Sequence, residues 1–300
     1  MKFKEAYSHL YTRLSLSCFL LLLTGCSSLD LLNAVTPDGN SKLQTNISYG
    51  SQRRQTLDIH VPSTLRESTP VIIFIYGGRW QSGTKEEYQF VGQALAKRGI
   101  MTVVPDYRLF PEVEFPEFIS DTAKVTQWTL NNIEQYGGDP SQVHLMGHSA
   151  GAHIVAMLAT NKTYLTEHAA SLEQIKGVIG LSGGYDFKIT DPDIKQVFRK
   201  AKDYPSTQPI SFVDGSEPPL LLLHGKKDVT LSPTNSLNLA TKVNELGGHA
   251  EYIIYDDMAH VGILLSLANN PMMYFPPLLD DIEKFVFCGT SRIKTVSNCS

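Results

Sequence analysis

Short, wholly apolar runs alternate with longer amphipathic segments from about Asn46 onward, and few folds accommodate that alternation. The run Val71–Tyr76 ends at Gly77-Gly78 and is typical of a strand buried on both faces of a parallel sheet. The predicted strands are Leu57–Val61, Val71–Tyr76, Met101–Val104, Val143–Met146, Ile175–Leu181, Leu220–Leu223 and Glu251–Tyr255. The predicted helices span residues 86–98, 116–136, 150–160, 233–246 and 278–287. This order predicts an α/β fold with a mostly parallel central sheet and helices on both faces.

Domain organisation follows from the same pattern. No linker divides residues 45–288, so we predict one domain there, followed by a C-terminal tail at 289–300. Residues 185–217 interrupt the alternation; they are polar, helical in part over Asp193–Lys202, and expected to form a small lid. The 42% hydrophobic and 19% charged residues exclude a disordered chain. The net charge of -4 argues against a nucleic-acid partner.

The first 26 residues have the pattern of a secretory signal. Lys2, Lys4 and Arg13 are followed by the apolar run Leu14–Leu23 and then by Leu23-Thr24-Gly25-Cys26. The apolar run is too short for a helix that crosses a bilayer of roughly 30 Å. An uncleaved anchor or a buried N-terminal helix is the alternative.

The tetrapeptide Leu23-Thr24-Gly25-Cys26 resembles the bacterial lipobox. That resemblance implies a signal peptide at 1–25, cleavage before Cys26, and acylation of Cys26, whose several acyl chains would anchor the chain in a lipid bilayer. Cys26 is followed by Ser27 and not by Asp. In the lipoproteins that this segment resembles, that pattern is typical of sorting to the outer membrane. The resemblance therefore implies that the protein lies in the bacterial cell envelope, at the outer membrane and facing the periplasm. Residues 26–44, mostly small and polar, are expected to be a flexible lipidated tether.

Two cysteines, Cys288 and Cys299, remain once the signal and Cys26 are set aside. In an oxidising compartment a local disulfide between them is the favoured prediction. Closing so short a loop would stabilise the fold by roughly 2–3 kcal/mol. Two free thiols are the alternative.

The segment Gly147-His148-Ser149-Ala150-Gly151 lies between the predicted strand Val143–Met146 and the helix 150–160. In that context G-x-S-x-G predicts a nucleophile elbow, a sharp turn that lifts the serine hydroxyl above the sheet edge. Tiny residues at both ends let the strand and the helix approach each other. The N-terminus of the helix would offer N–H groups to a developing oxyanion.

A serine nucleophile needs a base, and the base needs an orienting carboxylate. On such a sheet the chain order is serine, then acid, then histidine. Asp228 follows the strand Leu220–Leu223 and His260 follows Glu251–Tyr255, so both lie at the edge where Ser149 projects. Taken singly, Asp228 is typical of a turn former and His260 of a solvated loop residue. Their order along the chain after Ser149 predicts the triad Ser149, Asp228 and His260.

Other polar residues near these positions have simpler interpretations. Asp256 and Asp257 are expected to shape the loop before His260. His148 is expected to pack beside the elbow, with a place in the pocket as the alternative, and His144 is expected in the core. No metal or other cofactor is predicted, since no His-Glu-x-x-His is present and His148 and His153 are five apart.

An oxyanion hole needs at least two N–H donors, one from Ala150, directly after the serine, and others from a glycine loop after an earlier strand. Tyr76-Gly77-Gly78-Arg79-Trp80 is such a loop, because glycines let the backbone turn its N–H groups inward. An ordinary strand-ending turn is the alternative.

Together these residues resemble the α/β-hydrolase serine esterases of the His-Gly-Gly-x-Trp kind, with their feruloyl-esterase-like, kynurenine-formamidase-like and prenylcysteine-methylesterase-like branches. The resemblance spans about residues 45–287. Besides the elbow it rests on Gly77-Gly78-Arg79-Trp80, Asp106-Tyr107-Arg108-Leu109, Pro111, Phe115-Pro116, Tyr136-Gly137-Gly138-Asp139-Pro140 and His224-Gly225-x-x-Asp228.

The resemblance implies an α/β-hydrolase catalytic domain at 45–288 that hydrolyses esters of small to medium acyl groups through an acyl-enzyme, without a cofactor. It implies that Gly78, Arg79 and Ala150 donate backbone N–H groups to the oxyanion. The segment Asp106-Tyr107-Arg108 is implied to be structural.

The chain departs from the family where Tyr76 replaces the usual His. We expect a tyrosine to pack there, donate one hydrogen bond and leave the oxyanion loop usable. A second hypothesis is that the charge of Arg79 favours an anionic acyl portion, with a solvent-facing side chain as the alternative. An amidase or formamidase on the same triad stays open, as does a non-catalytic envelope binding module, although the intact triad argues against the latter.

Overall fold

The computed structural model describes residues 28–36, 41–268 and 277–289. Its strands are β1 (Lys42–Ser48), β2 (Thr56–Val61), β3 (Val71–Ile75), β4 (Met101–Pro105), β5 (Val143–His148), β6 (Ile175–Leu181), β7 (Leu220–Gly225) and β8 (Ala250–Tyr255). Its α-helices are α2 (Ser28–Val35), α3 (Gln89–Lys97), α4 (Glu117–Asn132), α5 (Ala150–Thr160), α6 (Thr163–Thr166), α7 (Pro192–Val197), α8 (Thr234–Glu245), α9 (His260–Leu265) and α10 (Leu278–Cys288). Short 3-10 helices include η1 (Lys85–Tyr88), η2 (Ile133–Tyr136), η6 (Pro209–Phe212) and η7 (Ser266–Ala268).

The eight strands form one sheet in the order β1-β2-β4-β3-β5-β6-β7-β8. β2 is antiparallel to both of its neighbours, and all the other pairs are parallel. The parallel strands therefore end at the same edge of the sheet, and the loops after β3, β5, β7 and β8 meet there. This edge is called the C-terminal edge below.

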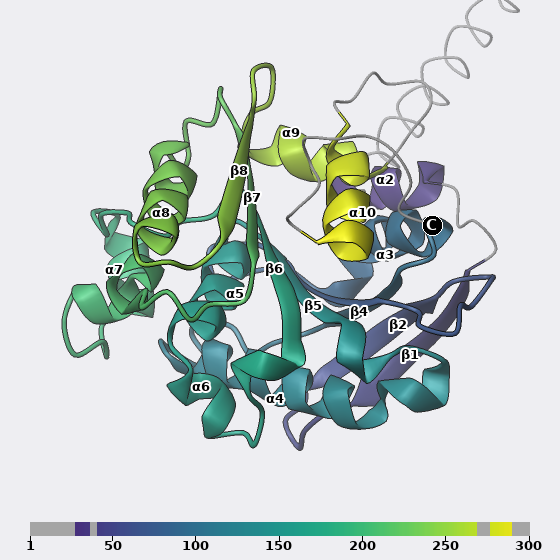
Figure 1. Cartoon of the computed structure of the whole chain (residues 1–300). Coiled ribbons are helices and arrows are strands. Elements are labelled where there is room, and N and C mark those ends of the chain that lie inside the picture. Colours follow the sequence, from purple (N-terminus) through teal and green to yellow (C-terminus); the bar gives the residue numbers. More distant parts are fainter. Residues whose placement is uncertain (1–27, 37–40, 269–276, 290–300) are drawn as a thin grey trace, which may run out of the picture.

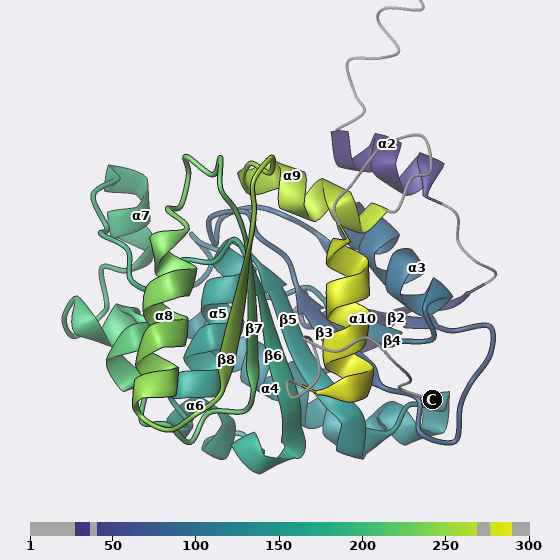
Figure 2. The same ribbon diagram turned by 45° about the horizontal axis from the view of Figure 1, so that its top comes forward.

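Helices cover both faces of the sheet (Figures 1 and 2). α3 and α10 lie on one face, and α4, α5 and α8 lie on the other. The central strands β3, β4 and β5 are buried along their whole length, as strands covered on both faces must be. The predicted α/β class, with a mostly parallel sheet covered on both faces, is confirmed.

The predicted strands and long helices are found close to their expected bounds, with three differences. The predicted helix 86–98 divides into η1 and α3, and the predicted helix 116–136 divides into α4 and η2. The helix expected over 193–202 is shorter, α7. β1 was not predicted, because it is exposed along almost its whole length and pairs only with β2. An edge strand of this kind has no apolar run.

The prediction of a flexible tether at 26–44 is wrong for the residues that the structure describes. Residues 28–35 form α2, and β1 begins at Lys42. Leu29 and Leu32 pack against the hydrophobic core, which the polar composition of the segment does not reveal. Asn33 adds hydrogen bonds to the backbone of Glu86 and Phe90.

The remaining N- and C-terminal predictions fall mostly outside the described residues. The signal peptide, Cys26 and Cys299 lie there. Cys288, at the end of α10, is disulfide-bonded, and its pairing with Cys299 stays a prediction. Among the helices of the described residues, none has the length and apolar character needed to span a bilayer.

The buried histidine His60 gives a test of this packing. It lies on β2 against Gly92 of α3, and neither of its ring nitrogens has a partner within the described residues. Burial lowers the pKa of His60 from 6.5 to about 4. Between these values the unfolded chain binds a proton that the folded chain does not, so stability is present above pH 6.5 and is lost as the pH falls toward 4.

We expect His60→Leu to remove this proton uptake. The drop in unfolding free energy between pH 7.5 and pH 5 should shrink by about 2 kcal/mol. Urea unfolding at the two pH values measures it, with His249→Leu, at a half-exposed histidine, as the matched control. An unchanged pH dependence in His60→Leu would contradict this account of the buried ring.

Candidate active site

Ser149 lies on a strained turn between β5 and α5. Its backbone has φ 54° and ψ -116°, a conformation that non-glycine residues rarely adopt. A Cβ on Gly151 would lie 2.0 Å from the carbonyl oxygen of Ile75 on β3, and one on Gly147 would lie 2.3 Å from the carbonyl oxygen of Gly151. The two glycines therefore allow the close approach of α5 to the sheet that the elbow requires, as predicted.

The structure brings Ser149, His260 and Asp228 together at the C-terminal edge. Ser149 Oγ lies 2.8 Å from His260 Nε2, and His260 Nδ1 lies 2.7 Å from Asp228 Oδ2. Because the carboxylate can only accept, Nδ1 carries the proton and Nε2 is free to accept from the serine hydroxyl. This arrangement can move a proton from Ser149 to His260.

Asp228 is held as a carboxylate by four donors. The N–H groups of Thr230 and Leu231 bind Oδ1 at 2.9 Å, and His260 and His224 approach Oδ2. Burial alone would raise the pKa of the Asp228 carboxyl, but the hydrogen bonds from His224, His260 and the Leu231 N–H outweigh it and hold the pKa well below its usual range.

The role of His224 beside the acid was not predicted. Its buried ring has Nε2 3.2 Å from Asp228 Oδ2 and 3.0 Å from the carbonyl oxygen of Leu231, while Nδ1 lies 2.8 Å from Ser236 Oγ. Nε2 faces two acceptors, so it carries the proton and donates to both. The only signal in the sequence was the spacing of His224-Gly225-x-x-Asp228.

His148 packs beside the elbow, as predicted, and it also supports His260. Its Nε2–H donates to the backbone carbonyl of His260 at 3.1 Å, and the two ring centroids lie 5.1 Å apart. Burial, with a smaller contribution from the charge of His260, lowers the pKa of His148 to about 3, so the ring is neutral. His144 and His153 are also buried, in β5 and α5 respectively.

The loop after β3 offers free backbone donors beside Ser149. Gly78, Arg79 and Trp80 all have positive φ. Within the described part of the chain, the N–H groups of Gly78 and Arg79 donate to no other group. Ala150 is the first residue of α5, where N–H groups have no acceptor inside the helix. These are the three donors that the sequence predicts for an oxyanion.

Tyr76, the first residue of this loop, holds it to the hydrophobic core. Its ring is fully buried and stacks between Tyr88 and Tyr107. Its hydroxyl donates to Asp106 Oδ1 at 2.6 Å and accepts from Arg54 at 2.8 Å. As expected, the tyrosine packs and donates one hydrogen bond, and its partner is the carboxylate of Asp106.

The Asp106-Tyr107-Arg108 segment supports the same region. Asp106 also accepts from the backbone N–H of Lys85, and the Tyr107 hydroxyl donates to the carbonyl of Tyr76 at 3.0 Å. Arg108 pairs with the buried Asp121 through two hydrogen bonds of 2.9 and 2.8 Å. The prediction that these residues are structural agrees with these contacts.

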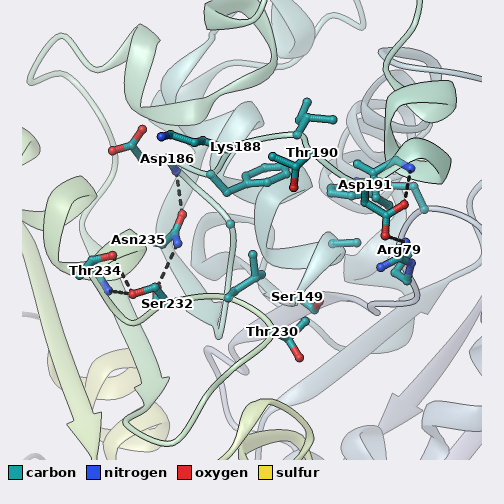
Figure 3. A pocket seen from close by; sticks show the side chains of 17 residues that line it. Arg79, Ser149, Asp186, Lys188, Thr190, Asp191, Thr230, Ser232, Thr234 and Asn235 are labelled. Atoms are coloured by element: carbon teal, nitrogen blue, oxygen red, sulfur yellow. Dashed lines mark hydrogen bonds and ion pairs between the residues drawn. The ribbon is translucent and has the colours of Figure 1, made fainter.

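A cavity of about 430 Å³ opens beside Ser149 (Figure 3). It lies between the loop after β3, the segment 184–194 and the segment 230–235. The rings of Trp80 and Phe187 stack along it with their centroids 6.1 Å apart, and Ile194 adds a further apolar side chain. Residues 185–217 thus contribute one wall of the cavity, as expected for a small lid.

Arg79 and Asp191 form an ion pair at one side of the cavity, 2.7 Å long (Figure 3). Asp191 also caps α7 by accepting from the N–H groups of Asp193 and Ile194. The charge of Arg79 is therefore paired with that of Asp191, and 54% of the Arg79 side chain is exposed to solvent. The ion pair joins the loop after β3 to the lid.

Two exposed ion pairs join the loop that carries the acid to the loop that carries the histidine. Lys226 binds Asp256 and Lys227 binds Asp257, each at 2.7 Å, so the aspartates shape the loop before His260 as predicted. Among the described residues, no group of three His, Cys, Asp or Glu side chains is placed to hold a metal ion.

Solved structures share this fold. A truncated carbohydrate esterase from gut microbiota superimposes with a TM-score of 0.69 at 22% identity, covering 84% of this chain and 98% of that one. The apo form of esterase 2 of Thermogutta terrifontis gives 0.67 at 18% identity, covering 82% and 93%. The chain therefore has the α/β-hydrolase fold.

Proteins with related sequences are named as hydrolases. The chain is 30% identical over 254 residues to an isoprenylcysteine alpha-carbonyl methylesterase of Arabidopsis thaliana, which is 75% of this chain and 58% of that protein. It is 33% identical over 148 residues to a kynurenine formamidase of Salmo salar, covering 49% of this chain and 48% of that protein. The chain thus spans less than two thirds of the length of these relatives.

A family model, BD-FAE, matches residues 57–243, which include β2 through most of α8 and with them Ser149 and Asp228. The match covers more than half of the chain. The chain belongs to the BD-FAE family.

Proposed function

We propose that the chain is a cofactor-free serine hydrolase of carboxylic esters with small to medium acyl groups. The observation that carries the proposal is the hydrogen-bonded series Ser149, His260 and Asp228, with Ser149 at the wall of a cavity of about 430 Å³. Family membership and relatives named as esterases support the ester class. The cavity volume is within the usual range for small-molecule sites, which favours a small-molecule ester over a polymeric substrate.

The geometry suits acyl transfer in two halves. Ser149 Oγ attacks the acyl carbon while its proton passes to His260 Nε2, and the N–H groups of Gly78, Arg79 and Ala150 stabilise the oxyanion. The ester C–O bond then breaks, and His260 protonates the departing alkoxide. Water, deprotonated by His260, attacks the acyl-enzyme; the bond to Ser149 breaks as His260 returns the proton to Oγ, and the carboxylic acid leaves.

A panel of p-nitrophenyl esters from acetate to palmitate, with a p-nitroanilide of the best acyl group, tests the substrate class. We expect the highest kcat/KM at short to medium chains, because the walls formed by Trp80, Phe187 and Ile194 limit the acyl group. Anilide hydrolysis at a rate similar to that of the ester would favour an amidase. No turnover on any ester from folded protein would favour the binding module.

His224 is expected to affect the rate constant of the reaction and leave substrate binding intact. His224→Leu removes one of the two histidine donors on Asp228 Oδ2, so the carboxylate is held less firmly and orients His260 less well. We expect kcat to fall by about 10- to 100-fold with KM nearly unchanged. The acid limb of the pH profile of kcat/KM should also move.

Two variants separate this role from general damage to the fold. His224→Gln, which can still donate to Asp228, should restore part of kcat. Ser236→Ala removes only the bond at Nδ1 and should change kcat much less. A rise in KM alone in His224→Leu, or no rescue by Gln from a folded protein, would contradict the assignment.

We also propose that the protein is anchored in the bacterial envelope through acylated Cys26. The lipobox-like Leu23-Thr24-Gly25-Cys26 supports this proposal. Mass spectrometry of the N-terminal peptide of the mature protein tests it. An unmodified Cys26 would contradict it.

A further inference from the structure

We propose that the C-terminal edge of the sheet faces the lipid bilayer, so that the cavity takes esters held at the membrane surface. This inference rests on the proposed function and on the proposed acylation of Cys26. It goes beyond both, because an anchor alone does not fix which side of a domain meets the membrane.

The first step is the place of α2. Asn33 Nδ2 donates to the carbonyl of Glu86 at 2.9 Å, and Asn33 Oδ1 accepts from the N–H of Phe90 at 2.9 Å. Both partners lie in η1 and the first turn of α3, directly after the loop that leaves the C-terminal end of β3. α2 is therefore fixed at the edge that carries Ser149, and both views place α2 and α9 on that side (Figures 1 and 2).

The second step is the reach of the anchor. Ser28, the first residue of α2, is two residues after Cys26. An extended chain spans at most about 3.6 Å per residue, so the two-residue link from Cys26 to the start of α2 has a maximum length of about 7 Å. A flexible tether of the predicted length would let the domain turn freely, whereas this link holds α2, and the edge on which it is fixed, next to the acyl chains.

The third step is the surface at this edge. Val229, next to Asp228, is 98% exposed, and Val261, next to His260, is 51% exposed. Single exposed apolar residues are common on soluble proteins. Both follow strands that end at the C-terminal edge, Val229 after β7 and Val261 after β8, and the lysines and aspartates of the same loops form ion pairs. Exposed apolar side chains set between paired charges fit the interfacial region of a bilayer.

The opposite edge supplies a matched control. Leu65 is 46% exposed and follows β2, which runs antiparallel to β4. Leu65 therefore lies at the edge where the parallel strands begin. The proposal places it away from the bilayer.

Fluorescence quenching tests the orientation without any reference to catalysis. The full-length acylated protein would be reconstituted in phosphatidylethanolamine and phosphatidylglycerol vesicles, with a bimane label on Val229→Cys or on Leu65→Cys. We expect nitroxide lipids to quench the label at 229 at least threefold more than the label at 65. Equal quenching, or stronger quenching at 65, would overturn the proposal, as would the absence of acyl groups on Cys26.

Kinetics then test the consequence for the substrate. In the same vesicles, Val229→Ser combined with Val261→Ser should lower the hydrolysis rate of hexadecyl acetate at least tenfold and leave that of soluble p-nitrophenyl acetate unchanged. Leu65→Ser should alter neither. Equal losses on both esters would overturn the proposal. If the wild type hydrolyses neither ester, the proposed function fails, and the quenching result still decides the orientation.

Discussion

Replacing Ser149 by alanine is expected to lower kcat on p-nitrophenyl esters by about 10⁴- to 10⁶-fold. The substitution removes the oxygen that lies 2.8 Å from His260 Nε2, so no acyl-enzyme can form. The small remaining rate would come from water activated by His260 and from the N–H donors of Gly78, Arg79 and Ala150. Steady-state kinetics on the best ester of the panel measure the loss.

The control is the fold of the variant itself. Alanine at this position keeps the backbone strain of φ 54° and the contacts of α5, so the unfolding midpoint should stay close to that of the wild type. A matched change at Ser182, which also has positive φ and a buried hydroxyl but no part in the series, should preserve most of kcat. A Ser149→Ala variant that keeps more than about a tenth of the wild-type kcat would contradict the proposed mechanism.

Gly151→Ala is expected to destabilise the fold strongly, although it adds a single methyl group. The new Cβ would lie 2.0 Å from the carbonyl oxygen of Ile75 and 2.6 Å from that of Tyr76. Both are backbone atoms, so α5 or β3 has to shift. We expect the free energy of unfolding to fall by at least about 3 kcal/mol, as measured by urea denaturation.

The same shift would displace the loop that begins at Tyr76, so kcat should fall together with stability. Gly262→Ala in α9 is the matched control, because its added Cβ meets only the sulfur of Met258 at 3.4 Å. Alanine there should be neutral or stabilising by up to about 1 kcal/mol, since it favours the helix. Equal stability of the two variants would mean that the approach of α5 to β3 is looser than the structure has it.

The sequence predicts the centre of the sheet well and its rim poorly, for a physical reason. Strands such as β3 and β5 are buried on both faces, so their apolar runs are visible without knowledge of their neighbours. β1 is exposed along most of its length, and α2 is a short helix within a segment that is rich in Ser, Asn, Asp, Gly and Pro. Their place depends on contacts with η1 and β2, which no local pattern encodes.

The same distinction holds within the site. Ser149, Asp228 and His260 could be predicted because each lies shortly after the end of a strand, at β5, β7 and β8, and parallel strands bring such positions to one edge. The contact of His224 with Asp228 could not, because it depends on where a ring at the end of β7 points. The hydrogen bond from Tyr76 to Asp106 could not be predicted either. It depends on where the two side chains point, because they follow the neighbouring strands β3 and β4.

Trapping the acyl-enzyme tests the central claim most directly. The wild-type protein would be mixed with p-nitrophenyl butyrate, quenched in acid within milliseconds and digested for mass spectrometry. The proposed mechanism predicts a butyryl group on the peptide that contains Ser149, and its absence from Ser149→Ala. Ester turnover without any adduct on Ser149, or an adduct on another residue that forms and decays at the rate of turnover, would contradict it.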